Sequence, residues 1–201
     1  INTRYLAREE TAGRVAEYIA QMVKLRLGKY IAYFPSYAYL RMIRHHLEEM
    51  DLPPLIVQSQ EMDEAARQAF LEAFTMDSQP KLGLCVLGGL FSEGIDLPGE
   101  QLIGAMIVGV GLPVPSSRLR AIQDCYHRHF GDGFGYAFRI PGIQKVVQAA
   151  GRVIRTQEDR GVIFLLDERY YQPEYAQLLP EHWNLYNENI AAAGHILAGQ
   201  S

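Results

Sequence analysis

The sequence predicts an α/β domain with a mostly parallel sheet and helices on both faces. Short apolar runs bounded by glycine, proline or aspartate alternate with segments whose apolar residues recur at helical spacing. Such alternation indicates βαβ units, in which helices cover both faces of the sheet. Ligands of such sheets gather at the carboxyl ends of the strands, so a functional site is expected in the loops that follow the strands.

Five apolar runs carry the strand prediction. Each is short and is preceded or closed by a turn-forming residue, as is typical of strands buried on both faces. The runs are Lys29 to Phe34, Leu55 to Val57, Leu82 to Leu87, Ile103 to Val110 and Val162 to Leu166.

Helical periodicity fills the intervening segments. In the first helix Val15, Ile19 and Met22 share one face, and Ser36 is placed as the N-cap of a second helix. The remaining predicted helices run from Met62 past Phe74, from about Ser116 to Phe130, and from about Pro141 to Arg155. Glycines 131, 133 and 135 lie between the last two helices, and we interpret them as a flexible turn.

The bulk properties limit the organisation and the partners. The chain has 201 residues, of which 48% are hydrophobic, so we expect one domain over residues 1–201, with residues 170–201 as an extension packed on it. The net charge is −4, so contact with nucleic acid would need local basic clusters. The two cysteines, Cys85 and Cys125, indicate free thiols and an intracellular protein, cytoplasmic and nucleoid-associated if bacterial. No apolar run is long enough to span a bilayer, so no membrane partner is expected.

The predicted helix from Pro141 to Arg155 separates its residues by face. At about 100° per residue, Gln148, Arg152 and Arg155 lie opposite an apolar face. That apolar face consists of Ile143, Val146, Val147, Ala150 and Ile154. Guanidinium groups are planar forks that match phosphate oxygens, so the polar face is a candidate phosphate contact. A solvated polar face is the alternative.

This polar face carries the first resemblance to a known family. Gln148-Ala149-Ala150-Gly151-Arg152-Val153-Ile154-Arg155 resembles motif VI of superfamily-2 helicases, Gln-x-x-Gly-Arg-x-x-Arg. The resemblance implies that Arg152 and Arg155 act as catalytic arginine fingers toward the γ-phosphate of ATP. It also implies that Gln148 belongs to the ATP site.

A second match lies after the third apolar run. The segment from Gly88 through Ser92-Glu93-Gly94-Ile95-Asp96 resembles motif V of XPD/DinG-type DNA helicases. The resemblance implies ATP contacts from Glu93, Gly94 and Asp96 and a DNA contact from Ser92. Several roles are open for Glu93 and Asp96. They can accept a hydrogen bond from a ribose hydroxyl, orient the arginines, sense the nucleotide or simply be solvated. The loop lacks the basic residue that XPD relatives often carry, which argues against a phosphate contact at Gly88.

Further matches extend the resemblance from about Thr3 to Tyr170. Phe34-Pro35-Ser36-Tyr37 resembles motif IV, which implies that Ser36 and Tyr37 contact DNA. Ser36 at a helix N-terminus suits a DNA phosphate, and an N-cap role is compatible with that contact. Arg118 follows a Gly-x-Pro turn and, with Arg120, Arg128 and Arg139, is a candidate basic path for single-stranded DNA, although a solvated helix face is the alternative. The opening Thr3-Arg4-Tyr5 and the late Asp167-Glu168-Arg169-Tyr170 resemble segments of the same domain.

Two motifs of such helicases do not occur in this sequence, namely Gly-x-x-x-x-Gly-Lys-Ser/Thr and Asp-Glu-x-His. The resemblance therefore implies a RecA-like second motor domain whose partner, the N-terminal motor domain of the same parent, holds most of the ATP and Mg²⁺ contacts. An iron–sulfur cluster would also belong to that other half, and no metal ligands are expected here. We accordingly expect this chain alone to be inactive.

Two other functions remain open at this point. A RecA-like fold can serve as a non-catalytic module that binds nucleic acid or protein. An unrelated α/β hydrolase would need a nucleophile such as Ser36 or Ser92 paired in space with a histidine.

Overall fold

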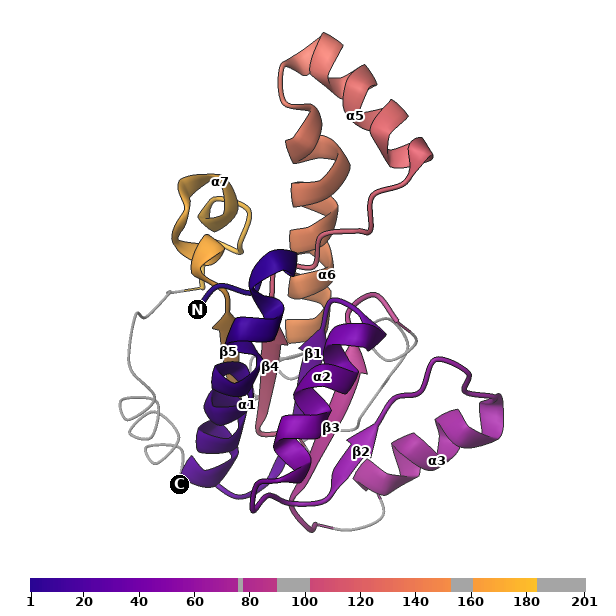
Figure 1. Cartoon of the computed structure of the whole chain (residues 1–201), viewed down its shortest axis with the longest axis vertical. Helices are drawn as coiled ribbons and strands as arrows, with labels where there is room; N and C mark the ends of the chain where they lie inside the picture. Colours follow the sequence, from indigo (N-terminus) through magenta and orange to yellow (C-terminus); the bar gives the residue numbers. More distant parts are fainter. Residues whose placement is uncertain (76–77, 90–101, 153–160, 184–201) are drawn as a thin grey trace.

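A computed structural model describes residues 1–75, 78–89, 102–152 and 161–183 (Figure 1). Its centre is a five-stranded sheet in the order β2-β3-β1-β4-β5, with every pairing parallel. The strands are β1 (Lys29–Phe34), β2 (Leu55–Val57), β3 (Lys81–Val86), β4 (Gly104–Val108) and β5 (Val162–Leu166). The predicted α/β class is confirmed, and all five apolar runs form strands. The fourth is shorter than predicted, because Gly109 turns the chain at a φ of +84°.

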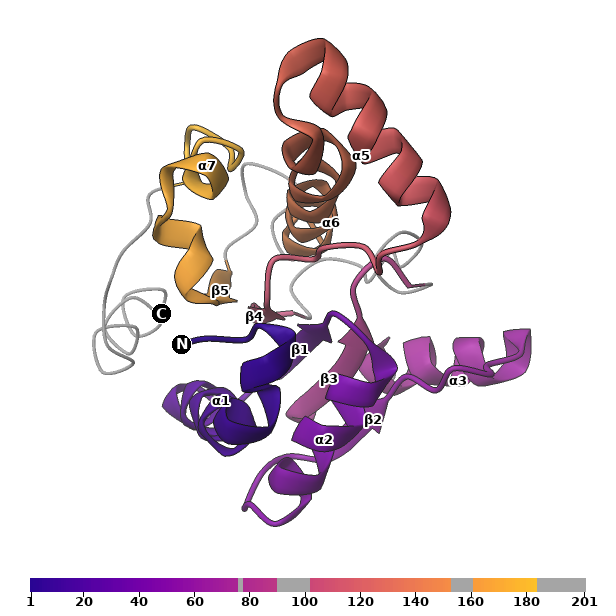
Figure 2. The same ribbon diagram turned by 45° about the horizontal axis from the view of Figure 1, so that its top comes forward.

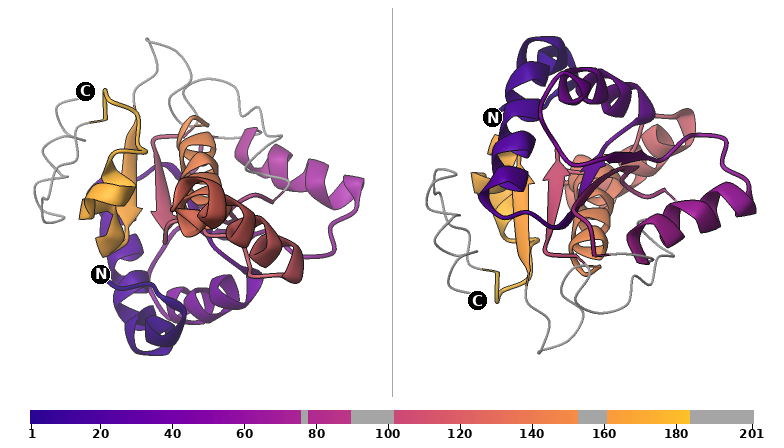
Figure 3. Two further views of the ribbon diagram at one scale, coloured as in Figure 1. Left: turned by 90° about the horizontal axis from the view of Figure 1, so that it is seen from above. Right: turned by 90° about the horizontal axis from the view of Figure 1, so that it is seen from below.

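Helices cover both faces of the sheet, as Figure 3 shows from above and below. Helices α1 (Arg8–Leu25) and α2 (Tyr37–Glu48) lie on one face, where Ile19, Leu40 and Ile43 pack against Phe34 and Met106 in one core cluster. Helix α6 (Ile140–Ala150) and helix α3 (Glu64–Thr75) supply the core of the opposite face. Residues of β1 alternate between these two clusters, because successive side chains of a strand point to opposite faces.

The carboxyl ends of the strands meet at one edge of the sheet. Phe34 pairs with Val86 and Tyr33 pairs with Ile107, so the loops after β1, β3 and β4 start at nearly the same level. Val108 likewise pairs with Leu166 at the end of β5. The parallel topology therefore gathers four loops from distant parts of the sequence.

Helix α5 (Ser117–Phe130) and α6 form a hairpin that extends beyond the carboxyl edge of the sheet (Figures 1 and 2). No residue of α5 is buried. At the hairpin's corner the rings of Tyr126 and Tyr136 stack with centroids 4.7 Å apart, and Phe130 packs beside them. Large aromatic groups therefore gather at the end of the hairpin farthest from the core.

The glycines between α5 and α6 do not form the flexible turn that we predicted. Gly131 ends α5 in the left-handed conformation with a φ of +77°, as a helix C-cap glycine commonly does. Gly133 already belongs to the next helix, where a Cβ atom would lie 2.2 Å from the carbonyl oxygen of Gln123. The two helices therefore approach closely at this corner, and position 133 is a glycine because a side chain there would collide with the backbone of α5.

The helix that contains α6 also differs from the prediction at both ends. It begins at Gly133, passes through a π-helical turn over Gly135–Arg139, and ends at Ala150 rather than at Arg155. The amide of Ile140 donates to the carbonyl oxygen of Gly135, five residues earlier. A proline inside a regular α-helix collides with the carbonyl four residues before it, and the wider turn before Pro141 relieves that conflict. Gly151 supplies the C-cap, so Arg152 follows the helix instead of continuing its polar face.

The described part of the tail packs on the α6 face of the sheet. The 3-10 helix Glu168–Tyr171 and the short helix α7 (Pro173–Ala176) bury Tyr170 and Tyr175 in the core. Leu179, after α7, is buried in the same core, and Trp183 is partly buried against it. Whether all of residues 170–201 form an extension stays a prediction, because residues 184–201 lie outside the described ranges.

Candidate functional site

The loop after β1 places both residues of the predicted motif IV at the carboxyl edge of the sheet. Ser36 is the N-cap of α2, because its side chain accepts a hydrogen bond of 3.3 Å from the amide of Tyr39. The first turn of α2 contains no acidic residue. The predicted N-cap is thus confirmed, while the DNA contact of Ser36 and Tyr37 stays a prediction.

A buried glutamine joins this loop to the next one. The Gln58 side chain donates from Nε2 to the Tyr37 hydroxyl at 2.9 Å and accepts from the amide of Val86 at 2.8 Å. Gln58 is 2% exposed and follows the end of β2. Sequence reasoning missed it, because nothing in the local pattern around Gln58 shows that both partners come from other elements.

The loop after β3 receives a positive charge from another part of the chain. Gly88 has a φ of +71°, and a Cβ atom on it would lie 3.2 Å from Lys145 Nζ. Lys145 belongs to α6, on the turn before Gln148. The loop itself has no basic residue, as the sequence shows, and Lys145 of the neighbouring helix places a positive charge beside Gly88. The expectation that Gly88 makes no phosphate contact stays a prediction.

The end of α6 brings the predicted nucleotide residues to the same region. Gln148 is exposed on the last turn of α6, and Arg152 is partly buried just beyond it. Burial raises the pKa of Tyr33, near the end of β1, and the positive charge of Arg152 acts in the opposite direction. The Arg152 guanidinium therefore lies within electrostatic reach of the carboxyl edge of the sheet.

Several predicted site residues lie outside the described ranges. They are Ser92, Glu93, Gly94, Asp96 and Arg155. The structure does describe the points from which their segments start, namely Gly89 after β3 and Arg152 after α6.

A groove of about 730 Å³ opens at the same edge, between the N-terminal segment, the loop after β4 and the α5–α6 hairpin. Among the described residues, four arginines line it and no aspartate or glutamate does, although the whole chain has a net charge of −4. The four arginines are Arg4, Arg8, Arg120 and Arg169. Such a groove is electrostatically suited to a polyanion.

The predicted basic path is only partly assembled along this groove. Arg120 lines the groove, and Arg118 is exposed close by on the first turn of α5. Arg139 instead pairs with Asp132 at 3.3 Å, and its guanidinium lies 5.5 Å from the ring centroid of Tyr175. Its side chain therefore contributes to packing between the hairpin and the tail.

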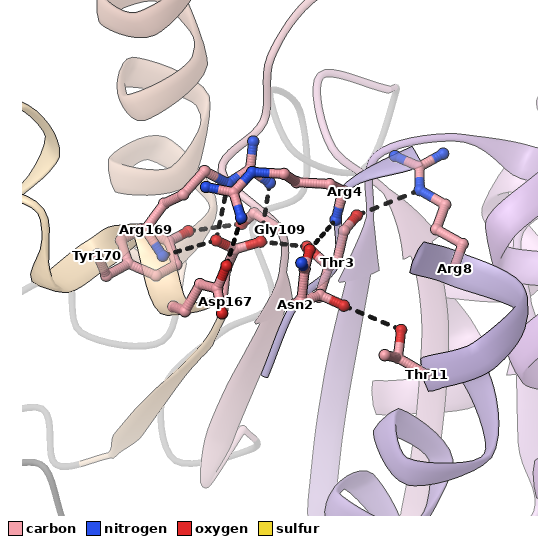
Figure 4. Close-up of polar contacts among 10 residues, drawn as sticks. Asn2, Thr3, Arg4, Arg8, Thr11, Gly109, Asp167, Arg169 and Tyr170 are labelled. Atoms are coloured by element: carbon pink, nitrogen blue, oxygen red, sulfur yellow. Dashed lines mark hydrogen bonds and ion pairs between the residues drawn. The ribbon is translucent and has the colours of Figure 1, made fainter. Parts of the chain in front are cut away.

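The N-terminal segment is fixed to the end of β5 by a buried polar cluster (Figure 4). Asp167 accepts hydrogen bonds from Arg169 Nε and Nη2, each at 2.8 Å, and from the Thr3 hydroxyl. The Tyr170 hydroxyl donates to the carbonyl oxygen of Gly109 at 2.6 Å. Burial would raise the pKa of Asp167, but the bonds from Arg169 and Thr3 outweigh burial and lower it. The ionised, buried carboxylate of Asp167 therefore fixes Thr3 and Arg169, which both line the groove.

Arg8 crosses from this cluster to α2. Its guanidinium lies 4.7 Å from the ring centroid of Tyr39 and 5.6 Å from that of Tyr5, and its Nε donates to the carbonyl oxygen of Thr3 at 3.4 Å. Burial lowers its pKa, and the charge of Arg169 acts in the same direction. No carboxylate in the described ranges forms an ion pair with Arg8.

The described ranges offer neither a cluster of metal ligands nor a helix suited to a membrane. There, no three His, Cys, Asp or Glu side chains come together as a metal site would require. Over the same residues, every helix is too short or too polar to pass through a bilayer. Cys85 is buried and Cys125 exposed, and both are free thiols.

Comparisons with known proteins agree on one family. Residues 19–185 match the family described as the helicase C-terminal domain. The ATP-dependent helicase DinG of Mycobacterium tuberculosis is 26% identical over 175 residues, covering 84% of this chain and 25% of that protein. The mouse ATP-dependent DNA helicase DDX11 is 27% identical over 195 residues, covering 85% of this chain and 21% of that protein. This chain thus spans a fifth to a quarter of the length of these relatives.

A solved structure shows the same fold. The chain superposes on an apo form of XPD with a TM-score of 0.71 and 22% identity, covering 89% of this chain and 36% of that one. The match to the RecA-like architecture includes the parallel sheet with helices on both faces.

Proposed function

Because the chain belongs to the helicase C-terminal domain family of XPD- and DinG-type helicases, we propose that it is the second motor domain of an ATP-dependent DNA helicase. In this proposal the longer protein couples ATP hydrolysis to translocation on single-stranded DNA. The N-terminal motor domain of that protein binds most of the ATP and the Mg²⁺. The observation that carries the proposal is the charge at the carboxyl edge of the sheet, where Lys145 lies beside Gly88 and where, among the described residues, arginines but no acidic side chain line the groove.

The nucleotide side of the proposal rests on the end of α6. Arg152, and Arg155 three residues later, are the proposed arginine fingers, which stabilise negative charge that develops on the γ-phosphate. Gln148 is exposed on the turn before them and is available to the same ligand. Glu93, Gly94 and Asp96 are proposed to complete this side of the ATP site. Lys145 adds a positive charge beside Gly88, at the start of their loop.

The DNA side of the proposal rests on the groove and on the N-terminus of α2. Ser36 lines the groove, and Tyr37 follows it on α2. Exposed amides at a helix start and arginine side chains are both common contacts of DNA phosphates. Ser92 and Arg118 are proposed to make further contacts with the DNA.

Gln58 gives the two sides a physical connection. The side-chain amide of Gln58 bonds to the Tyr37 hydroxyl on the proposed DNA side and to the backbone amide of Val86 on the proposed nucleotide side. Val86 lies two residues before Gly88. A shift of either loop must therefore strain a buried hydrogen bond, which supports coupling between ATP state and DNA contact.

The 201-residue chain by itself is expected to hydrolyse no ATP above background. It carries neither the phosphate-binding loop nor the Asp-Glu-x-His box, so ATP would meet only the arginine side of the site. The measurement is phosphate release at saturating ATP and Mg²⁺, with and without single-stranded DNA. Steady DNA-stimulated turnover by this chain would refute the assignment to the second motor domain.

Binding of single-stranded DNA by the chain is expected to be weak and strongly dependent on salt. The net charge of −4 opposes binding, so affinity comes from the few phosphates that the groove contacts. The logarithm of the association constant should fall by about 0.7 per contacted phosphate for each tenfold rise in salt. Fluorescence anisotropy with oligo-dT at several salt concentrations measures this slope, with duplex DNA as the comparison. A slope near zero would contradict a phosphate track.

A further inference from the structure

The groove has an aromatic component that phosphate binding does not explain. Tyr5 lines it, and 79% of the Tyr5 surface is exposed. Water is an unfavourable surrounding for so much aromatic surface, and an exposed ring that lines a concave, charged groove indicates a ligand with an apolar face.

The Tyr5 ring is also held in place. The guanidinium of Arg8 lies 5.6 Å from its centroid and is itself fixed by Tyr39 and by the carbonyl oxygen of Thr3. Thr3 in turn bonds to the buried carboxylate of Asp167. The Tyr5 ring therefore lies beside the Arg8 guanidinium, which other residues hold in place. The large exposed fraction of Tyr5 leaves the rest of its ring open to a ligand in the groove.

The charges around Tyr5 select the kind of ligand. Of the four arginines in the groove, Arg4 pairs with Glu168 and Arg169 pairs with Asp167. Arg8 and Arg120 have no carboxylate partner in the described ranges. A ligand that fits this arrangement carries negative charge and a flat aromatic face together, and a nucleotide of single-stranded DNA has both.

We propose that Tyr5 is a stacking platform for one unpaired base of single-stranded DNA, with the adjoining phosphate held beside Arg8 and Arg120. This inference rests on the proposed DNA binding and adds the residue that contacts a base. Arg8 is a positioning residue in it, because it supports the ring as well as contributing charge. Stacking is tolerant of sequence, so the site would retain DNA without selecting a base.

The test compares two ligands with and without bases. One is oligo-dT, and the other is an abasic oligonucleotide of the same length, which keeps the phosphates. Tyr5→Ala should weaken oligo-dT binding on the order of tenfold, since stacking contributes about 1–3 kcal/mol per base. The same substitution should leave binding of the abasic ligand unchanged. Tyr5→Phe keeps the ring and should bind both ligands as the unsubstituted chain does.

Control variants separate the possible outcomes. Tyr171→Ala removes a ring that is 54% exposed outside the groove and should affect neither ligand. Arg120→Ala should weaken both ligands equally, because it removes charge and no ring. Equal weakening of both ligands by Tyr5→Ala, or no weakening, would overturn the stacking proposal while DNA binding stands. If the unsubstituted chain binds neither ligand at low salt, the proposed DNA track itself is wrong.

Discussion

Replacing Arg152 with alanine in the full-length protein is expected to lower DNA-stimulated ATP hydrolysis by a factor on the order of 10³–10⁵, the range that arginine fingers contribute in related phosphoryl transfer. The loss follows if its guanidinium stabilises charge present only in the transition state. Affinity for single-stranded DNA should change far less, because Arg152 does not line the arginine groove. Steady-state phosphate release with DNA in excess measures the first effect and anisotropy the second.

Matched variants make this test specific. Arg152→Lys should not restore turnover, because an ammonium group lacks the planar fork of guanidinium. Arg14→Ala removes an exposed arginine from α1, on the other face of the sheet, and should hydrolyse ATP normally. Thermal melts of all variants exclude misfolding as the cause. Normal turnover by a well-folded Arg152→Ala protein would show that this arginine belongs to a solvated surface and would remove the main support for the motor-domain proposal.

Asp167→Ala is expected to produce the largest loss of stability among single substitutions near the site, about 3–5 kcal/mol in the free energy of unfolding. The substitution leaves the guanidinium of Arg169, 9% exposed, without its carboxylate partner and removes the acceptor of the Thr3 hydroxyl. Urea unfolding of the 201-residue chain measures the change. Glu168→Ala is the control, because it removes only the exposed pair with Arg4 and should cost less than about 1 kcal/mol. A similar small cost for both variants would contradict a supporting role for the cluster.

The same carboxylate makes stability depend on pH. The pKa of Asp167 is lower in the folded chain than in the unfolded chain, so ionised Asp167 stabilises the fold above its unfolded pKa. That contribution is lost as pH falls below about 4 and through the lower folded pKa. In the Asp167→Ala variant this part of the acid dependence should disappear.

The fold was largely predictable from the sequence because local signals agreed with the global topology. The runs around Tyr33, Cys85 and Ile107 are apolar on both faces, as strands in the middle of a parallel sheet must be. The N-cap role of Ser36 also follows from local chemistry. By contrast, the end of α6 was predicted five residues too late, at Arg155 instead of Ala150, because the periodicity continues past Gly151 although the helix does not.

The candidate site was less predictable because its contacts join residues that are far apart in the chain. The side chain of Gln58 bonds to Tyr37 and Val86, and Thr3 bonds to Asp167, which is 164 residues later in the sequence. Lys145 supplies to Gly88 a charge that the loop itself lacks. Periodicity and spacing describe one segment at a time, so they do not contain these relations.

The π-helical turn over Gly135–Arg139 rotates the side chains that follow it around the helix axis, relative to those that precede it. One residue more than an α-helical turn advances the following side chains by about 100° around the axis. Gly133 is therefore free to face α5 while Ile143 and Val146 face the sheet, although a single continuous helix carries all three. The π-helical turn therefore lets one continuous helix present one face to α5 and a different face to the sheet.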